Sequence, residues 1–154
     1  MVNLRIEDLL VGHDEIDAQH GILVRRFGDV KRAATAADGP ALGAALAQLW
    51  DDVVAHFATE EALMDEFGYP ERAAHRSAHH LFLEDLKALV RERELQGVSE
   101  EVAGWALQRL PEWLSFHIET NDAPLARFIA RKSARQMIAT ALGEPPPDRS
   151  RRES

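Results

Sequence analysis

Cysteine is absent from the 154-residue chain. This absence excludes disulfides, thiolate zinc sites, iron–sulfur clusters and cysteine nucleophiles. Long apolar runs are also lacking, since no segment approaches the roughly 20 residues that a membrane-spanning helix needs. The first ten residues carry Arg5, Glu7 and Asp8 and contain no apolar stretch typical of a secretory signal. The sequence therefore predicts a cytoplasmic protein that neither enters nor binds a membrane.

Basic residues are the scarcer charged class, with 18 Lys and Arg against 26 Asp and Glu and a formal net charge of −8. A nucleic-acid surface needs clustered cations that neutralise phosphates, so this balance argues against a nucleic-acid partner. Hydrophobic residues make up 45% and charged residues 29%, which is typical of a globular chain. The length fits one domain with one core.

Strand signals are weak, because long alternating runs of β-branched and aromatic residues are missing. Breaks containing glycine or proline near residues 38–40, 67–70 and 96–99 separate segments rich in helix-forming residues. The expected helices run from about Asp14 to Ala37, from Pro40 to Phe67, from about Pro70 to Leu95, and from Ser99 to about Thr120.

Two prolines complicate the C-terminal half. Pro111 lies inside the fourth expected helix, where it predicts a kink or a later start. A shorter fifth helix is expected after Pro124. Four long helices with short connections predict an all-α, antiparallel up-down-up-down four-helix bundle, with the fifth helix at its C-terminal side. We expect this domain to cover residues 1–142 and residues 143–154, which include three consecutive prolines, to be a disordered tail.

Seven histidines are the most informative residues of the chain, although single pairs carry little weight. Chance alone gives about one His-x-x-x-Asp/Glu pair at this composition. His80 with Glu84 and His13 with Asp17 have that spacing and are interpreted as coincidental. A lone pair four residues apart is therefore no evidence of a metal site.

The joint placement of the other histidines is more specific, because each of the four expected helices offers at least one metal-binding side chain. Residues four apart share a helical face. A spacing of five does not, so Asp122 would have to reach back from the end of the fourth helix. Buried polar groups need partners, and a metal would supply them. The candidate ligands are His20, His56, Glu60, His75, His79, His117 and Asp122.

These residues lie in segments that resemble the bacterial hemerythrin pattern over about residues 11 to 130. The segments are Ile16–His20, His56–Met64, Tyr69-Pro70 followed by His75 and His79, and Trp113–Ile118 followed by Asp122. Two departures stand out. The region before Val11 lacks a tryptophan often found there in the family, and Pro111 enters the last bundle helix.

The resemblance implies two iron ions. His75, His79 and His117 would bind one iron, and His20 and His56 would bind the other. Glu60 and Asp122 would bridge both, together with a solvent-derived oxo or hydroxo group. One coordination position would then remain open, on the iron with two histidines, and an open position is what ligand binding requires. The implied function is reversible dioxygen binding by a protein that is not an enzyme.

The resemblance also implies an apolar wall around the bound ligand. Leu114 matches the family's pocket leucine, and its candidate neighbours are Trp113, Phe57, Met64 and Phe82. Each neighbour could equally be an ordinary core residue. Asp17, Glu61 and Tyr69 are candidates for orienting the ligands, or are surface and turn residues.

Several alternatives remain open at this stage. A ferritin-like enzyme would need Glu-x-x-His motifs and a zinc protease would need His-Glu-x-x-His, and both are absent. Within the hemerythrin class the site could store or deliver oxygen, sense it through an unknown partner protein, or act as a redox or peroxidase enzyme. A metal-free structural bundle is the last alternative.

Overall fold

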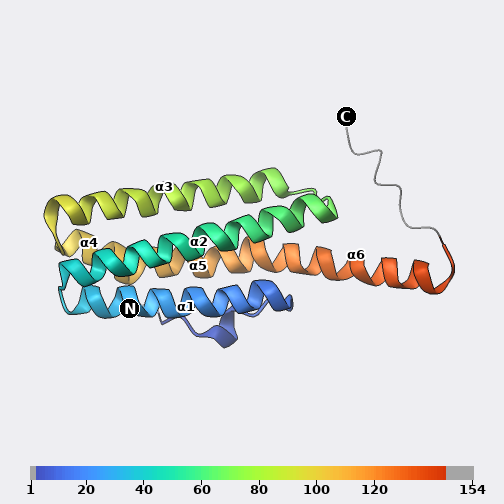
Figure 1. Ribbon diagram of the computed structural model, residues 1–154, viewed down its shortest axis with the longest axis horizontal. Coiled ribbons are helices and arrows are strands. Elements are labelled where there is room, and N and C mark those ends of the chain that lie inside the picture. The colour runs from blue at the N-terminus through green and yellow to red at the C-terminus, as the bar shows by residue number, and fades with distance from the viewer. Residues whose placement is uncertain (1–2, 145–154) are drawn as a thin grey trace.

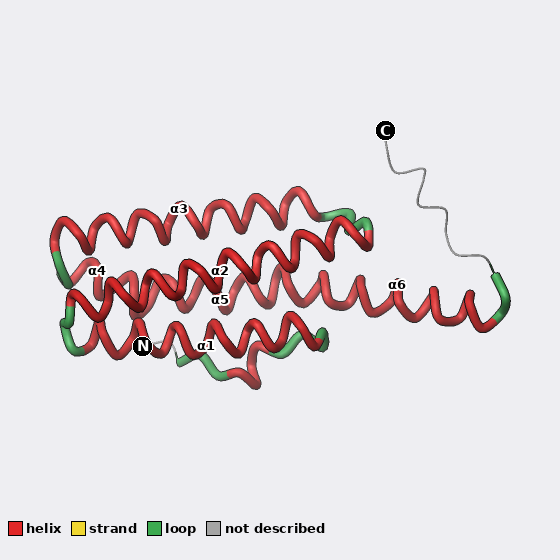
Figure 2. The backbone as a smooth tube through the Cα atoms, viewed as in Figure 1, coloured by secondary structure: helices red, strands yellow, loops and turns green. Residues whose placement is uncertain are grey.

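The computed structural model describes residues 3–144, which form a bundle of long antiparallel helices without strands (Figures 1 and 2). A short 3-10 helix, η1 (Ile6–Leu9), lies against the outside of the bundle. The first three bundle helices are α1 (Asp14–Thr35), α2 (Gly39–Phe67) and α3 (Arg72–Gln96). The expected all-α, up-down-up-down architecture is therefore confirmed.

Side-chain caps and glycines set the ends of these helices. His13 Nδ1 accepts a hydrogen bond from the amide of Ile16, so this histidine caps α1. The Asp38 carboxylate caps α2 through the amide of Ala41. Gly68 ends α2 with φ of 64°, a left-handed conformation that glycine adopts without strain. The turns predicted from Gly and Pro are thus the turns of the bundle.

The fourth rod of the bundle is continuous and composite, and it runs past Thr120, the expected end of the fourth helix (Figure 1). The expected C-terminal helix exists, but it continues the fourth helix in the same direction. The rod consists of α4 (Glu100–Gly104), the π-helical turn η2 (Trp105–Arg109), α5 (Leu110–His117), the π-helical turn η3 (Ile118–Asp122) and α6 (Ala123–Ala141).

Each π-helical turn stands directly before a proline-containing helix. The amide of Leu110 donates to the carbonyl of Trp105, and Pro111 follows. The amide of Ala123 donates to the carbonyl of Ile118, and Pro124 follows. A proline ring normally clashes with the carbonyl four residues earlier, and a wider turn moves that carbonyl away. The fourth helix therefore starts before Pro111, at Glu100, and the later start that was one of the two outcomes expected from the sequence is wrong.

The apolar core falls into two clusters along the bundle. The larger cluster includes Leu49, Phe57 and Phe82, and the smaller includes Ile16 and Met64. On α1, His20 lies between Ile16 of the smaller cluster and Leu23 of the larger, and on α2 Glu60 lies between Phe57 and Met64, so a polar layer crosses the bundle there. No helix among residues 3–144 is long and apolar enough to cross a membrane. Most of the expected disordered tail, residues 145–154, lies outside the described residues.

Candidate metal centre

All seven candidate ligands meet in the polar layer between the two apolar clusters. None of them is more than 2% exposed to solvent. Their donor atoms form two groups, each with all atoms within 4.8 Å of one another. One group holds His75, His79 and His117, the other holds His20 and His56, and both groups contain Glu60 and Asp122.

The two carboxylates lie between the two histidine groups, with one oxygen toward each. Asp122 Oδ2 is 2.9 Å from His20 Nε2, whereas Asp122 Oδ1 is 3.0 Å from His117 Nε2. Glu60 Oε1 is 2.5 Å from His56 Nε2, whereas Glu60 Oε2 is 2.8 Å from His75 Nε2. Each carboxylate could therefore bind two metal ions at once, one through each oxygen.

The π-helical turn η3 explains how Asp122 reaches this layer. In an α-helix a residue five positions after His117 lies off the face that His117 occupies. The turn from Ile118 to Asp122 closes with a bond between residues five apart and so contains one extra residue. Asp122 thereby takes the place that a residue four positions on would take. The expectation from the sequence, that Asp122 reaches back from the end of the fourth helix, is therefore wrong: Asp122 lies within a continuous helical rod.

Several donor atoms of the layer are buried without a hydrogen-bond partner among the described residues. They include Nε2 of His56, Nε2 of His79 and both carboxylate oxygens of Glu60. Although His56 Nε2 and Glu60 Oε1 are close, they are not aligned as a hydrogen bond. Buried polar atoms without partners are costly. Imidazole nitrogens and carboxylate oxygens that converge in this way fit metal ions, which would satisfy all of them together.

Without metal, His56 and His75 hold protons in this layer, whereas burial lowers the pKa of His117. Burial lowers the pKa of His56, but the carboxylates of Asp122 and Glu60 outweigh burial and raise it to about 9. The pKa of His75 is raised to about 9 for the same reasons. Burial and the charge of Asp122 raise the pKa of Glu60, yet His56, His75 and His79 lower it further, to about 2. Without metal, the protonated imidazoles of His56 and His75 thus face the two carboxylates, and metal cations can replace those protons.

Outer hydrogen bonds orient three of the histidine rings. His20 Nδ1 lies 3.0 Å from the backbone carbonyl of Leu9, and His56 Nδ1 lies 2.7 Å from Gln19 Oε1. His79 Nδ1 lies 3.4 Å from Glu61 Oε1. Such partners fix the ring orientation of metal-binding histidines. Sequence reasoning anticipated Glu61 but missed Gln19 and Leu9.

The other two orienting candidates form no hydrogen bond to a candidate ligand among the described residues. Asp17 accepts hydrogen bonds from the amides of Val11 and Gly12 and so anchors the chain before α1. Tyr69 is buried in the smaller cluster, where its ring packs against Phe128. Their contacts are structural, the alternative that the sequence left open.

Aromatic rings wall the layer on the side of the larger cluster. Phe57 stacks on His79 with ring centroids 3.7 Å apart, and Trp113 stacks on His117 at 4.6 Å. Phe82 stacks in turn on Trp113 at 4.1 Å, and Leu114 is buried in the same cluster. Met64 belongs to the smaller cluster and lies apart from these four.

Comparison with known proteins now places the chain. The family model for the hemerythrin HHE cation binding domain matches residues 11–129. The chain belongs to the hemerythrin family. It is 32% identical to a bacteriohemerythrin of Stenotrophomonas maltophilia over 120 residues, which is 78% of this chain and 76% of the relative. It is 28% identical to a myohemerythrin of Theromyzon tessulatum over 75% of this chain and 84% of the relative.

Solved structures support the same fold. A crystal structure of a hemerythrin mutant superposes with a TM-score of 0.72 at 21% identity, covering 84% of this chain and 97% of that one. Hemerythrin family members are oxygen-binding proteins and not enzymes, so the expectation that this chain is not an enzyme is confirmed at the level of the family. The family and the cluster of buried ligands together support a hemerythrin-type di-iron protein.

Proposed function

We propose that the chain binds dioxygen reversibly at a pair of iron ions. His75, His79 and His117 would hold one iron, and His20 and His56 would hold the other. Glu60 and Asp122 would bridge both, with a solvent-derived oxo or hydroxo group as third bridge. The observation that carries the proposal is the sharing of both carboxylates between a three-histidine group and a two-histidine group.

The unequal number of histidines leaves one open position. Three histidine nitrogens and three bridging oxygens would complete six-fold coordination at one iron, whereas two nitrogens and three oxygens would leave the other iron five-coordinate. A vacant position is what a metal centre needs to accept an exogenous ligand. When bound, the iron pair would supply the electrons for reversible dioxygen binding. Imidazole and carboxylate donors suit iron, and the chain has no thiolate to favour another metal.

The protein's own groups would orient the donors and exclude water. The Leu9 carbonyl and the Gln19 amide hold the rings of His20 and His56, the two histidines of the open iron. Phe57, Phe82, Trp113 and Leu114 form the apolar wall on one side of the layer, and Met64 closes it from the other. An apolar wall favours dioxygen over water and slows irreversible oxidation of the centre. Storage, delivery and sensing remain alternative uses of this binding, and a cytoplasmic location stays a prediction.

The test combines metal analysis with visible spectra of protein reduced without air and then exposed to oxygen. We expect about two irons per chain, by the ligand count, and an absorption band that appears with oxygen and disappears on deoxygenation. Iron that oxidises without a reversible band would instead favour redox or peroxidase chemistry. Protein that takes up no iron when it is expressed with ample iron would refute the proposal and favour a metal-free structural bundle.

Two histidine variants make the test specific. His56→Ala removes one of the two nitrogens from the open iron and should abolish the reversible band while the helical circular dichroism is retained. His80→Ala is the matched control, because His80 is exposed and lies outside both ligand groups. Unchanged oxygen binding in His56→Ala would refute the ligand assignment.

A further inference from the structure

The helix α6 continues beyond the ends of α1, α2 and α3 as a protruding arm (Figure 1). Lys132 Nζ donates a hydrogen bond to the carbonyl of Phe67, at 2.7 Å, which ties α6 to the end of α2. The match to the hemerythrin family model ends at residue 129. Residues 130–142, here called the C-terminal arm, therefore lie beyond the segment that the family model matches.

A helix-terminating motif in the sequence sets the C-terminal end of the arm. Gly143 has φ of +76°, its amide donates to the carbonyl of Thr140, and the amide of Glu144 donates to the carbonyl of Ala139. This pair of bonds is a Schellman motif, a common stop signal of helices. Alanine, arginine, glutamine and methionine fill most of the arm and are strong helix formers. The sequence thus specifies a protruding helix of defined length.

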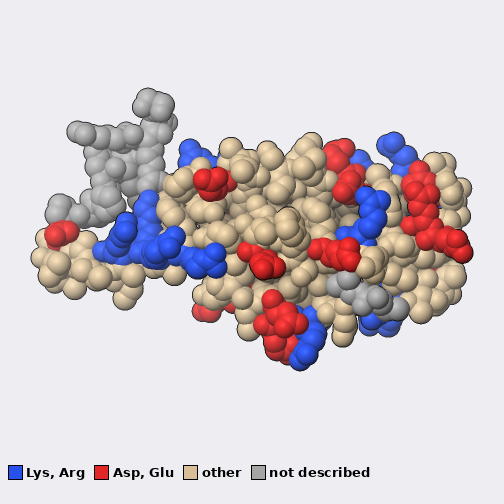
Figure 3. Space-filling model, turned by 180° about the vertical axis from the view of Figure 1, so that it is seen from behind, with Lys and Arg blue, Asp and Glu red and all other residues tan. Residues whose placement is uncertain are grey.

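The outer face of α6 combines positive charge with exposed apolar side chains. Residues 123–142 contain four Lys and Arg and no Asp or Glu, and basic side chains gather over this helix in Figure 3. Arg127, Arg131 and Arg135 follow at spacings of four, so they share one stripe. Within residues 3–144 none of these arginines forms an ion pair. Ile138 and Leu142, 61% and 70% exposed, extend the same stripe.

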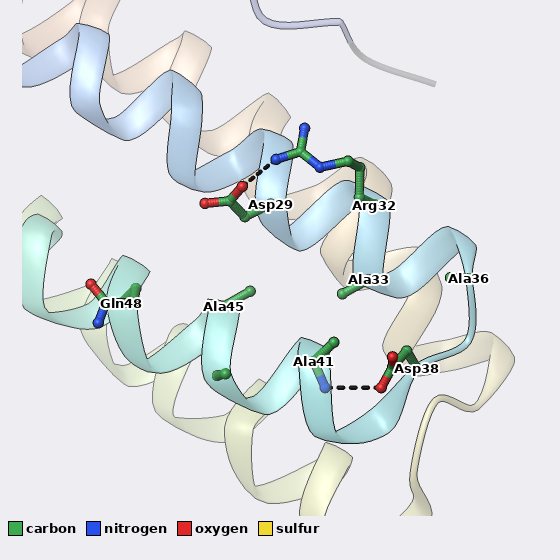
Figure 4. Close-up of a pocket in the computed structure, with 9 residues that line it drawn as sticks. Asp29, Arg32, Ala33, Ala36, Asp38, Ala41, Ala45 and Gln48 are labelled. Carbon is green, nitrogen blue, oxygen red and sulfur yellow. Dashed lines mark hydrogen bonds and ion pairs between the residues drawn. The ribbon is translucent and has the colours of Figure 1, made fainter.

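At the opposite end of the long axis, the corner between α1 and α2 carries a groove of about 510 Å³ (Figures 1 and 4). Alanines line it from both helices, among them Ala33 of α1 and Ala41, Ala44 and Ala45 of α2. The lining carries two carboxylates, of Asp29 and Asp38, and one guanidinium, of Arg32. Asp29 pairs with Arg32 and also with Arg26 beside the groove, so the excess negative charge of the rim lies at Asp38. Small apolar walls under an acidic rim suit a basic helix with apolar side chains.

We propose that a second copy of this chain occupies the groove, with the C-terminal arm of each copy docked at the α1–α2 corner of the other. Arm and groove lie at opposite ends of one molecule. An antiparallel pair therefore brings each arm to the other's groove, and the two contacts close a two-fold dimer. The net charge of −8 concentrates outside α6, so the basic arm is attracted to a second copy.

A membrane surface fits the arm less well. A helix that lies in a membrane interface has an apolar face along its whole length and cations on the opposite face. In the arm, Arg131 and Arg135 precede Ile138 and Leu142 along one stripe. The charged and the apolar side chains thus occupy successive parts of one stripe. The arginines could face the acidic rim of the groove while the apolar side chains contact its alanines.

The absence of cysteine allows a direct crosslinking test in the full-length protein. The double variant Ala44→Cys/Ile138→Cys should oxidise to disulfide-linked dimers that go no further, because two-fold contacts close. A ladder of larger products would mean an open head-to-tail chain and would overturn the closed dimer. The matched control Ala44→Cys/Leu81→Cys, which uses an exposed leucine of α3, should crosslink far less. Equal crosslinking of both variants would overturn the docking.

Sedimentation analysis tests the same contact without a crosslink, by comparing the oligomeric state of the native protein with that of surface variants. The native protein should be dimeric at low salt, whereas Arg131→Glu/Arg135→Glu and the groove-filling variant Ala44→Trp should be monomeric with unchanged circular dichroism. Arg25→Glu/Arg91→Glu makes the same charge change at exposed arginines elsewhere and should stay dimeric. A native protein that is monomeric throughout would overturn the proposal, as would a dimeric Ala44→Trp. Binding of monomers to phosphatidylserine vesicles through the arm would assign it to membranes instead.

Discussion

Deleting Asn121 tests whether the π-helical turn η3 is what brings Asp122 into the metal layer. The turn contains one residue more than an α-helical turn. Its removal leaves Asp122 four positions after His117, which keeps both on one face of an ordinary α-helix. Residue deletions inside helices normally rotate all that follows by about 100°. Here the rotation should be absent, and α6 should keep its packing.

The expected cost comes from Pro124. In the shortened helix its ring meets the carbonyl of Glu119, four positions earlier, and a proline in a helix interior costs about 3 kcal/mol. For a chain of this size that corresponds to a fall of roughly 10 °C in Tm. Combining the deletion with Pro124→Ala removes the clash and should restore most of the lost stability. Metal content should be retained in both variants.

Thermal unfolding followed by circular dichroism and metal content measured by mass spectrometry provide the assay. The control deletes Ser115 from α5, which has no π-helical turn, so His117 and everything after it rotate away from the layer. We expect that control to lose both metals and much of its cooperativity. Equal loss of metal in the two deletions would show that η3 does not supply the register of Asp122.

Three further outcomes follow from the geometry. Gln19→Leu removes the acceptor for His56 Nδ1 and should weaken metal binding about 10- to 100-fold, measured by chelator competition; recovery in Gln19→Glu would separate orientation from packing. In metal-free protein the pKa of His56 and His75 is raised to about 9. Protonation of these two histidines therefore stabilises the fold fully below pH 6.5, and this contribution should be lost as the pH rises through 9. A free energy of unfolding in urea that increases over this pH range would contradict the prediction. Leu49→Ala, at a fully buried site, should cost about 2–5 kcal/mol without loss of metal.

Much of the fold could be predicted because it depends on local signals. Glycine and proline mark each turn between α1, α2 and α3, and an Asp or Ser caps α2 and α4. The fourth rod was harder, because proline usually interrupts a helix. The backbone instead widens before Pro111 and Pro124, and that choice depends on packing along the whole bundle rather than on the neighbouring residues.

The candidate ligands could be found because α-helical periodicity places residues four apart on one face. This rule serves His56 with Glu60 and His75 with His79. It fails for Asp122, whose face depends on η3. It is silent on Leu9, because a backbone carbonyl leaves no mark in the sequence, and the 3-10 helix that presents it was not anticipated. Periodicity therefore finds side chains on regular helices and misses donors set by irregular backbone.

The asymmetry of the centre has a simple origin in how the helices share the donors. The third helix supplies two imidazoles through its pair four residues apart, whereas α1 supplies only His20, because the next position on its ligand face is apolar, at Leu23 and Val24. The carboxylates cannot correct this imbalance, since each already turns one oxygen toward each histidine group. In the proposed iron pair, the open position would therefore lie on the side of α1, where Leu9 and Gln19 contact the rings of His20 and His56.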